Sequence, residues 1–145
     1  MNGYFYMVTF LALGIISILA VISWSDIKQR RISNNSVLAL LALLLLFCYL
    51  HYGEIFILNG LATLAIGFVL FSLNVIGAGD VKLLAVLMLA VPGPGIVPLL
   101  FFISFFGFLL IVIGWIFFRQ NIKTQGLPYG VAISCGFLFT MWSLN

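Results

Sequence analysis

Charged residues are nearly absent from this chain. Of its 145 residues, 6% are charged and 65% are hydrophobic, whereas an ordinary soluble domain has roughly 25% charged residues. Histidine occurs once and cysteine twice, without a CxxC motif or a Cys/His cluster. The first scarcity excludes an ordinary water-soluble domain. The second leaves no basis for a zinc site or a structural disulfide, so we expect no metal and no other cofactor.

Long apolar runs dominate the sequence instead. Uncharged runs of about 18 residues or more predict transmembrane helices. The runs are residues 3–24, 32–53, 55–79, 83–118 and 124–145, and the fourth is divided by "PGPGIVP" at 92–98. We therefore expect a single all-α membrane domain over residues 1–145, a polytopic bundle of six transmembrane helices. The first run lacks a basic start and an A-x-A cleavage site, which indicates a retained span rather than a signal peptide.

The basic residues predict how this bundle is oriented. All of them follow the first, third or fifth of the six expected spans: Lys28, Arg30, Arg31, Lys82, Arg119 and Lys123. By the positive-inside rule their side of the membrane is cytoplasmic and both termini lie outside. The positive surplus suits contact with anionic lipid headgroups and does not indicate nucleic-acid binding.

The two aspartates are the candidates for chemistry. Asp26 lies at the end of the first expected span in "SWSDIKQRRISNN", and Asp80 opens the fourth in "GAGDVKLL". Both therefore reach the cytoplasmic side, whereas His51 and Glu54 fall in an outer loop. Two close carboxylates share one proton, which is what an aspartic hydrolase needs. A structural interpretation is also open, with Asp80 as a helix cap and Asp26 as a loop charge. An acid held within a membrane is by default a functional hypothesis.

Small and polar residues around the aspartates have weaker signals. Gly77 and Gly79 give room for the close approach of another backbone, or for a turn with positive φ. Lys82 could extend its ammonium group to the membrane–water interface, or it could lower the pKa of a nearby aspartate. Extension to the interface is the safer interpretation. The "NNS" run at 34–36 is typical of helix capping, so we assign it no catalytic role.

Three segments together resemble a known family. "GAGDVKLL" resembles the GxGD motif of type IV prepilin peptidases, "SDIKQRRISN" resembles their first-aspartate motif, and "LPYGVAI" at 127–133 is similar to the segment that opens their last helix. Ser33 stands where the family often has proline. The resemblance implies that Asp26 and Asp80 are the catalytic pair, with Gly77, Gly79, Lys82, Pro128, Tyr129 and Gly130 as substrate-binding or supporting residues. It implies no metal.

The resemblance also implies a substrate and a place. The substrate is expected to be a prepilin or pseudopilin whose basic leader is cut at the cytoplasmic face of a bacterial inner membrane. In size the chain is most like the small stand-alone peptidases of Flp/Tad-type pili, which lack N-methylation. Two alternatives stay open from the residues alone: a small transporter or proton pathway that uses the aspartates, and a non-catalytic pilus assembly subunit.

Overall fold

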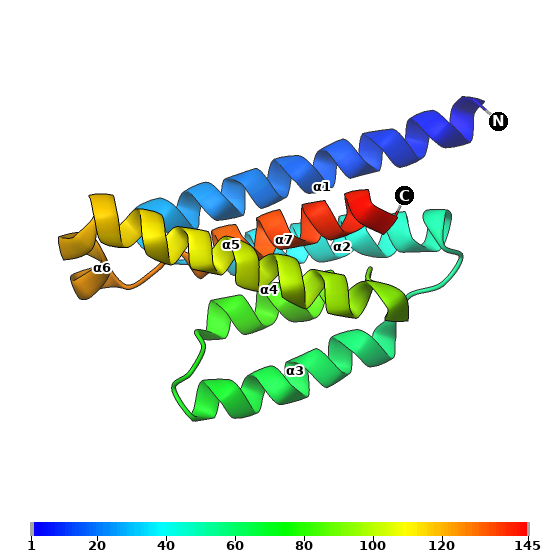
Figure 1. Cartoon of the computed structure of the whole chain (residues 1–145). Helices are drawn as coiled ribbons and strands as arrows, with labels where there is room; N and C mark the ends of the chain where they lie inside the picture. The colour runs from blue at the N-terminus through cyan, green and yellow to red at the C-terminus, as the bar shows by residue number, and fades with distance from the viewer. Residues whose placement is uncertain (1, 145) are drawn as a thin grey trace.

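A computed structural model describes residues 2–144, and within that range the regular elements are all helical. They are α1 (Asn2–Gln29), α2 (Asn34–His51), α3 (Ile57–Ser72), α4 (Ala78–Met88), the 3₁₀ helix η1 (Gly93–Gly95), α5 (Ile96–Phe117), α6 (Arg119–Gln125) and α7 (Tyr129–Leu144). The all-helical expectation is confirmed for the described residues, and both ends of the chain lie at the same end of the molecule (Figure 1).

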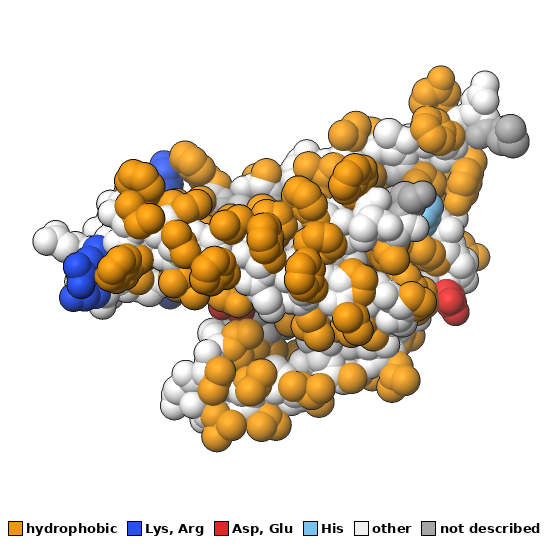
Figure 2. Space-filling view, in the orientation of Figure 1, with side chains coloured by type: hydrophobic (Ala, Val, Ile, Leu, Met, Phe, Trp, Pro, Cys, Tyr) orange, Lys and Arg blue, Asp and Glu red, His pale blue; other side chains and the backbone are white. Residues whose placement is uncertain are grey.

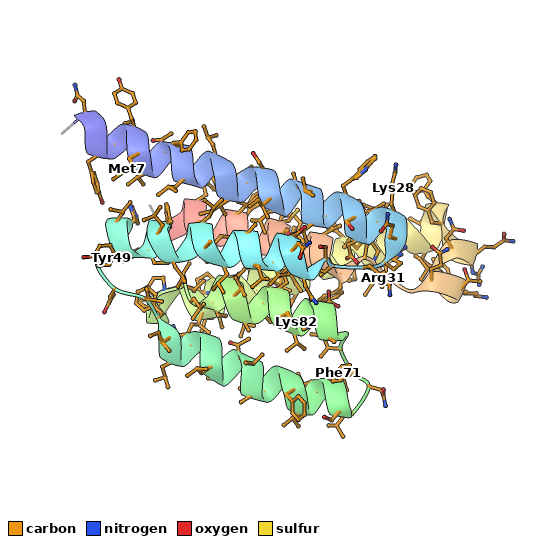
Figure 3. All side chains as sticks on the ribbon, turned by 180° about the vertical axis from the view of Figure 1, so that it is seen from behind. Met7, Lys28, Arg31, Tyr49, Phe71 and Lys82 are labelled. Carbon is orange, nitrogen blue, oxygen red and sulfur yellow. The ribbon has the colours of Figure 1, made fainter. Side chains whose placement is uncertain are left out.

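The helices surround one apolar core. The helix α1 packs on α2 and α7, α4 packs on α2, α3 and α7, and α5 packs on α7. Leu19, Leu40, Leu83, Leu99 and Phe137, one from each of α1, α2, α4, α5 and α7, are almost fully buried in it. The helix α3 forms the edge of the molecule farthest from α1 (Figures 1 and 3). It attaches through Gly60 and Gly67, where an added Cβ would collide with Leu89, just after α4, and with Val81 of α4.

Only some of the six expected spans have the length and composition of a membrane crossing. Among the described residues α1, α2 and η1 with α5 qualify, and α6 with α7 would make a fourth if this bent pair is one span. The 11 residues of α4 extend roughly 17 Å as a helix, about half of the hydrocarbon core. The coarse membrane assignment therefore stands, and six crossings with both termini outside stay a prediction.

The sixth expected span, residues 124–145, was predicted to begin too early in the sequence. Residues 124–145 do not form one helix, because α6 ends at Gln125 and α7 begins at Tyr129, with an angle of 101° between the two helices. Gly126 between them has a φ of +78°, a conformation that glycine adopts readily and that ends a helix. Pro128 then lacks the N–H that a continuing helix would need.

Candidate active site

A cavity of about 670 Å³ lies between the end of α1 with the α1–α2 connection, the start of α4, and the end of α6 with the α6–α7 connection. It is lined by Ser25, Asp26, Gln29, Arg30, Arg31, Ile32, Ser33, Asn34, Gly77, Ala78, Gly79, Asp80, Gln125 and Leu127. Figure 2 shows Lys and Arg side chains gathered at the same end of the molecule, and acidic atoms within the hollow beside the α3 edge. The structure thus brings both aspartates of the chain to one polar cavity.

Asp26 is held by the start of another helix. It lies in the last turn of α1 and is 6% exposed. The backbone N–H of Gly130, the second residue of α7, donates a hydrogen bond of 2.8 Å to its Oδ2. This bond and the positive end of the α7 dipole favour the ionised carboxylate and offset part of the cost of its burial.

Gly130 must be glycine for this contact. A Cβ at this position would lie 2.8 Å from Asp26 Oδ2 and 3.2 Å from Ile32 Cδ1. Real side-chain carbons essentially never approach within 3.0 Å, so any side chain here would displace the carboxylate. Gly130 is therefore a positioning residue for Asp26.

Asp80 occupies the first turn of α4, outside the helices that qualify as membrane spans. It is partly buried. Burial, and to a smaller extent the negative charge of Asp26, raises the pKa of the Asp80 carboxyl to about 6. Because this shift favours the neutral acid, Asp80 holds a proton at a pH where an ordinary aspartate has lost it.

The two glycines before Asp80 allow close packing. A Cβ at Gly77 would lie 3.3 Å from Asp80 Oδ2, and a Cβ at Gly79 would lie 3.3 Å from Cβ of Ile32. Neither glycine has a positive φ, so the expected positive-φ turn was wrong. The atoms nearest to these added carbons belong to side chains and not to another backbone. Gly77 leaves room for the carboxylate, and Gly79 lets the α1–α2 connection lie against α4.

Arg30 follows α1 in a left-handed conformation, with a φ of +53°. Its N–H donates to the carbonyl of Asp26 over 3.0 Å, and Ser25 Oγ donates to the carbonyl of Arg31 over 2.9 Å, which folds the connection back over the end of α1. The Nε and Nη1 atoms of the Arg30 side chain are buried and have no hydrogen-bond partner within the described structure. The positive charge of this side chain acts on Asp26.

The remaining predicted supporting residues occupy different places. Lys82 is exposed and its Nζ donates to Asn34 Oδ1 over 3.3 Å. The capping expectation for residues 34–36 was wrong, because Ser33 is the N-cap of α2 and its side chain makes no capping bond. Pro128 precedes α7, and the Tyr129 ring lies against α5 at Gly107, where a Cβ would be 2.9 Å from the Tyr129 hydroxyl.

The other titratable candidates lie away from this cavity. His51 ends α2, opposite the Asn34 end that lines the cavity, and its ring stacks on Phe47 with 5.1 Å between centroids. Glu54 follows in the next connection. Cys48 and Cys135 are both free thiols. Within residues 2–144 no three His, Cys, Asp or Glu residues come together as they would to hold a metal ion.

Sequence reasoning did not identify the bond from Gly130 to Asp26, nor the places of Arg30, Ile32 and Asn34 in the cavity. The basic "KQRR" run was interpreted as an orientation signal and as part of the segment that resembles a first-aspartate motif, and no single residue of it was placed in the cavity. Arg30 and Ile32 follow Asp26 closely in the segment "SDIKQRRISN", and this short separation was the available signal for them. No local pattern indicates which helix start lies against Asp26.

Comparison with known proteins adds one match. Residues 13–114 match the model of the type IV leader peptidase family. No curated protein and no solved structure matches the chain. The matched residues include Asp26, Asp80 and the glycines before Asp80, and end before the segment at 127–133. Because the match extends over more than half of the sequence, the chain belongs to the type IV leader peptidase family.

Proposed function

We propose that this chain is a membrane-embedded aspartic endopeptidase that removes the leader peptide of type IV prepilins, of the Flp type, at the cytoplasmic face of the inner membrane. The observation that carries the proposal is that both aspartates of the chain line one cavity. Family membership supports a leader peptidase. In this proposal the chain hydrolyses a peptide bond and does not methylate the new N-terminus.

The surroundings of the carboxyls support different roles for them. Asp80, with a pKa of about 6, is the acid. Asp26, with the Gly130 N–H and the charge of Arg30 beside it, is the base. As the oxygen of a water molecule bonds to the carbonyl carbon, Asp26 accepts a proton from that water and Asp80 donates its proton to the carbonyl oxygen. Collapse of the tetrahedral intermediate then breaks the C–N bond. The leaving amine receives the proton from Asp26, and one hydroxyl of the intermediate returns its proton to Asp80 as the C=O bond forms again.

The substrate is expected to lie across the boundary between water and lipid. A leader peptide is basic and the segment after it is apolar, so the junction lies near the cytoplasmic interface. The polar cavity at the Lys and Arg end of the helices is the part of the molecule that suits such a junction. This placement supports cleavage at the cytoplasmic side.

The test is processing of a co-expressed prepilin by Asp26→Asn and Asp80→Asn variants. Each substitution is expected to abolish cleavage while the protein stays in the membrane, because no other carboxyl group lines the cavity among the described residues. Full cleavage by either variant would remove that residue from the mechanism. Cleavage that is absent even with the wild-type chain would favour the transporter or the assembly subunit.

A further inference from the structure

A second hollow begins beside the candidate active site. It has a volume of about 460 Å³ and is lined by Asn34, Val37, Leu38 and Leu41 of α2, by Ile57, Gly60, Leu61 and Leu64 of α3, and by Lys82, Ala85, Val86 and Leu89 of α4. The helices α2 and α3 both pack on α4 and are hardly in contact with each other. The result is an apolar groove with α4 as its floor, which we call the α2/α3 groove.

The α2/α3 groove is continuous with the site. Asn34 lines both the groove and the cavity that contains the two aspartates. Lys82, which donates to Asn34, comes two residues after Asp80 and lies between α2 and α3 in Figure 3. From Lys82 the groove follows α4 to Leu89, roughly 10 Å along the helix axis, away from the polar end. Its polar lining residues lie at the aspartate end and the rest of its lining is apolar.

We propose that the α2/α3 groove binds the apolar helix that follows the leader in the substrate, with the scissile bond reaching the aspartates past Asn34. This inference rests on the proposed function and adds to it the path of the substrate. A helix lying in lipid and ending in a polar, unwound junction matches an apolar groove that ends in a polar cavity. Exposed Leu38, Leu61 and Leu64 present the side chains that would contact such a helix.

Two other hollows fit this role less well. One, of about 360 Å³, lies between α3, α4 and α5 on the other side of α3, and none of its described lining residues also lines the cavity. The other, of about 290 Å³, shares Arg30, Gln125 and Leu127 with the cavity. One of its walls is α6, whose sequence "RQNIKTQ" is polar. This hollow therefore lacks the apolar walls that the α2/α3 groove offers to a helix lying in lipid.

Neighbouring residues of α3 provide matched probes, because Leu61 and Leu64 line the α2/α3 groove whereas Ala62 and Ile66 line the hollow on the other side. A photocrosslinking amino acid is placed at each position in the full-length Asp80→Asn chain, co-expressed with the prepilin. Crosslinks to the prepilin are expected at positions 61 and 64, and they should be about tenfold more abundant there than at positions 62 and 66.

A second experiment uses the active chain. Leu64→Trp should slow prepilin processing about tenfold, and Ile66→Trp should slow it less than about twofold.

The outcomes separate the two proposals. Prepilin crosslinks mainly at 62 and 66, crosslinks only between two copies of this chain, or normal processing by Leu64→Trp present in the membrane at the wild-type amount would each overturn the groove while leaving the peptidase in place. If the wild-type chain does not process prepilin at all, the proposed function fails and the groove assignment fails with it. An equal loss in the Trp variants at 64 and 66 would likewise overturn the groove.

Discussion

Gly130→Ala is the most direct test of how Asp26 is positioned. The added methyl would lie 2.8 Å from Asp26 Oδ2 and 3.3 Å from its Cγ, so the carboxylate must move by roughly half an ångström or more to reach an ordinary contact distance. The movement lengthens or breaks the hydrogen bond from the Gly130 N–H. A misplacement of about 1 Å at a reacting group can lower the rate roughly 100-fold, so we expect processing to fall by about 10- to 100-fold.

The expected loss of stability is small compared with the roughly 5 to 15 kcal/mol that stabilises a folded domain. Losing a hydrogen bond to a buried charged group costs about 1.5 to 3 kcal/mol. Replacing a helical glycine by alanine returns about 0.5 to 1 kcal/mol. The net loss is therefore about 1 to 2 kcal/mol, which leaves the protein folded while the initial rate of prepilin cleavage in liposomes falls.

Gly136→Ala on the same helix is the matched control. Its Cβ would lie 2.6 Å from Cγ1 and 2.9 Å from the backbone nitrogen of Ile103 on α5, so it disturbs packing away from the aspartates and should destabilise the protein by about 1 to 3 kcal/mol. Cleavage per folded molecule should stay within about threefold of wild type. Wild-type cleavage by Gly130→Ala, or equal losses in the two variants, would refute the positioning role.

Three further results are expected. Processing in liposomes should decline as the pH rises above about 6, because Asp80, whose pKa is raised to about 6, then loses the proton it donates; a rate that does not change between about pH 5 and 8 would contradict this. Arg30→Gln should slow cleavage about tenfold, because it removes the positive charge beside Asp26. Arg119→Gln, at an exposed arginine that does not line the cavity, should not slow it. Cleavage should survive EDTA and serine- or thiol-directed reagents; loss with EDTA that a metal restores would argue against a two-aspartate mechanism.

The helical fold was predictable because lipid leaves the chain few choices. Backbone groups in a bilayer must be satisfied within the segment, so uncharged runs predict helices with little dependence on tertiary contacts. The break at 92–98 was predictable from its prolines and glycines and is found between α4 and α5. The boundary near 124 was not, because the polar "RQNIKTQ" segment of α6 has no apolar periodicity that distinguishes it from a connection.

The candidate pair of aspartates was predictable for a different reason. A chain with two aspartates, both at the same side of the predicted spans, offers no other pair of acids to bring together. Their separate environments were not predictable. The raised pKa of Asp80 depends on its burial, and this burial depends on tertiary packing around the start of α4, which no local pattern specifies.

The support of Asp26 shows why tertiary packing decides this site. Its hydrogen-bond donor lies 104 residues away, so α1 and α7 must meet at one depth. Pro128 and Gly126 separate α7 from α6 and let the helix begin at Tyr129. The Tyr129 ring lies against Gly107 of α5, which fixes the depth at which α7 starts. The N–H of the next residue then points at a carboxylate that would otherwise be buried without a partner. We therefore expect the Pro-Tyr-Gly segment to affect the chemistry by placing a helix terminus.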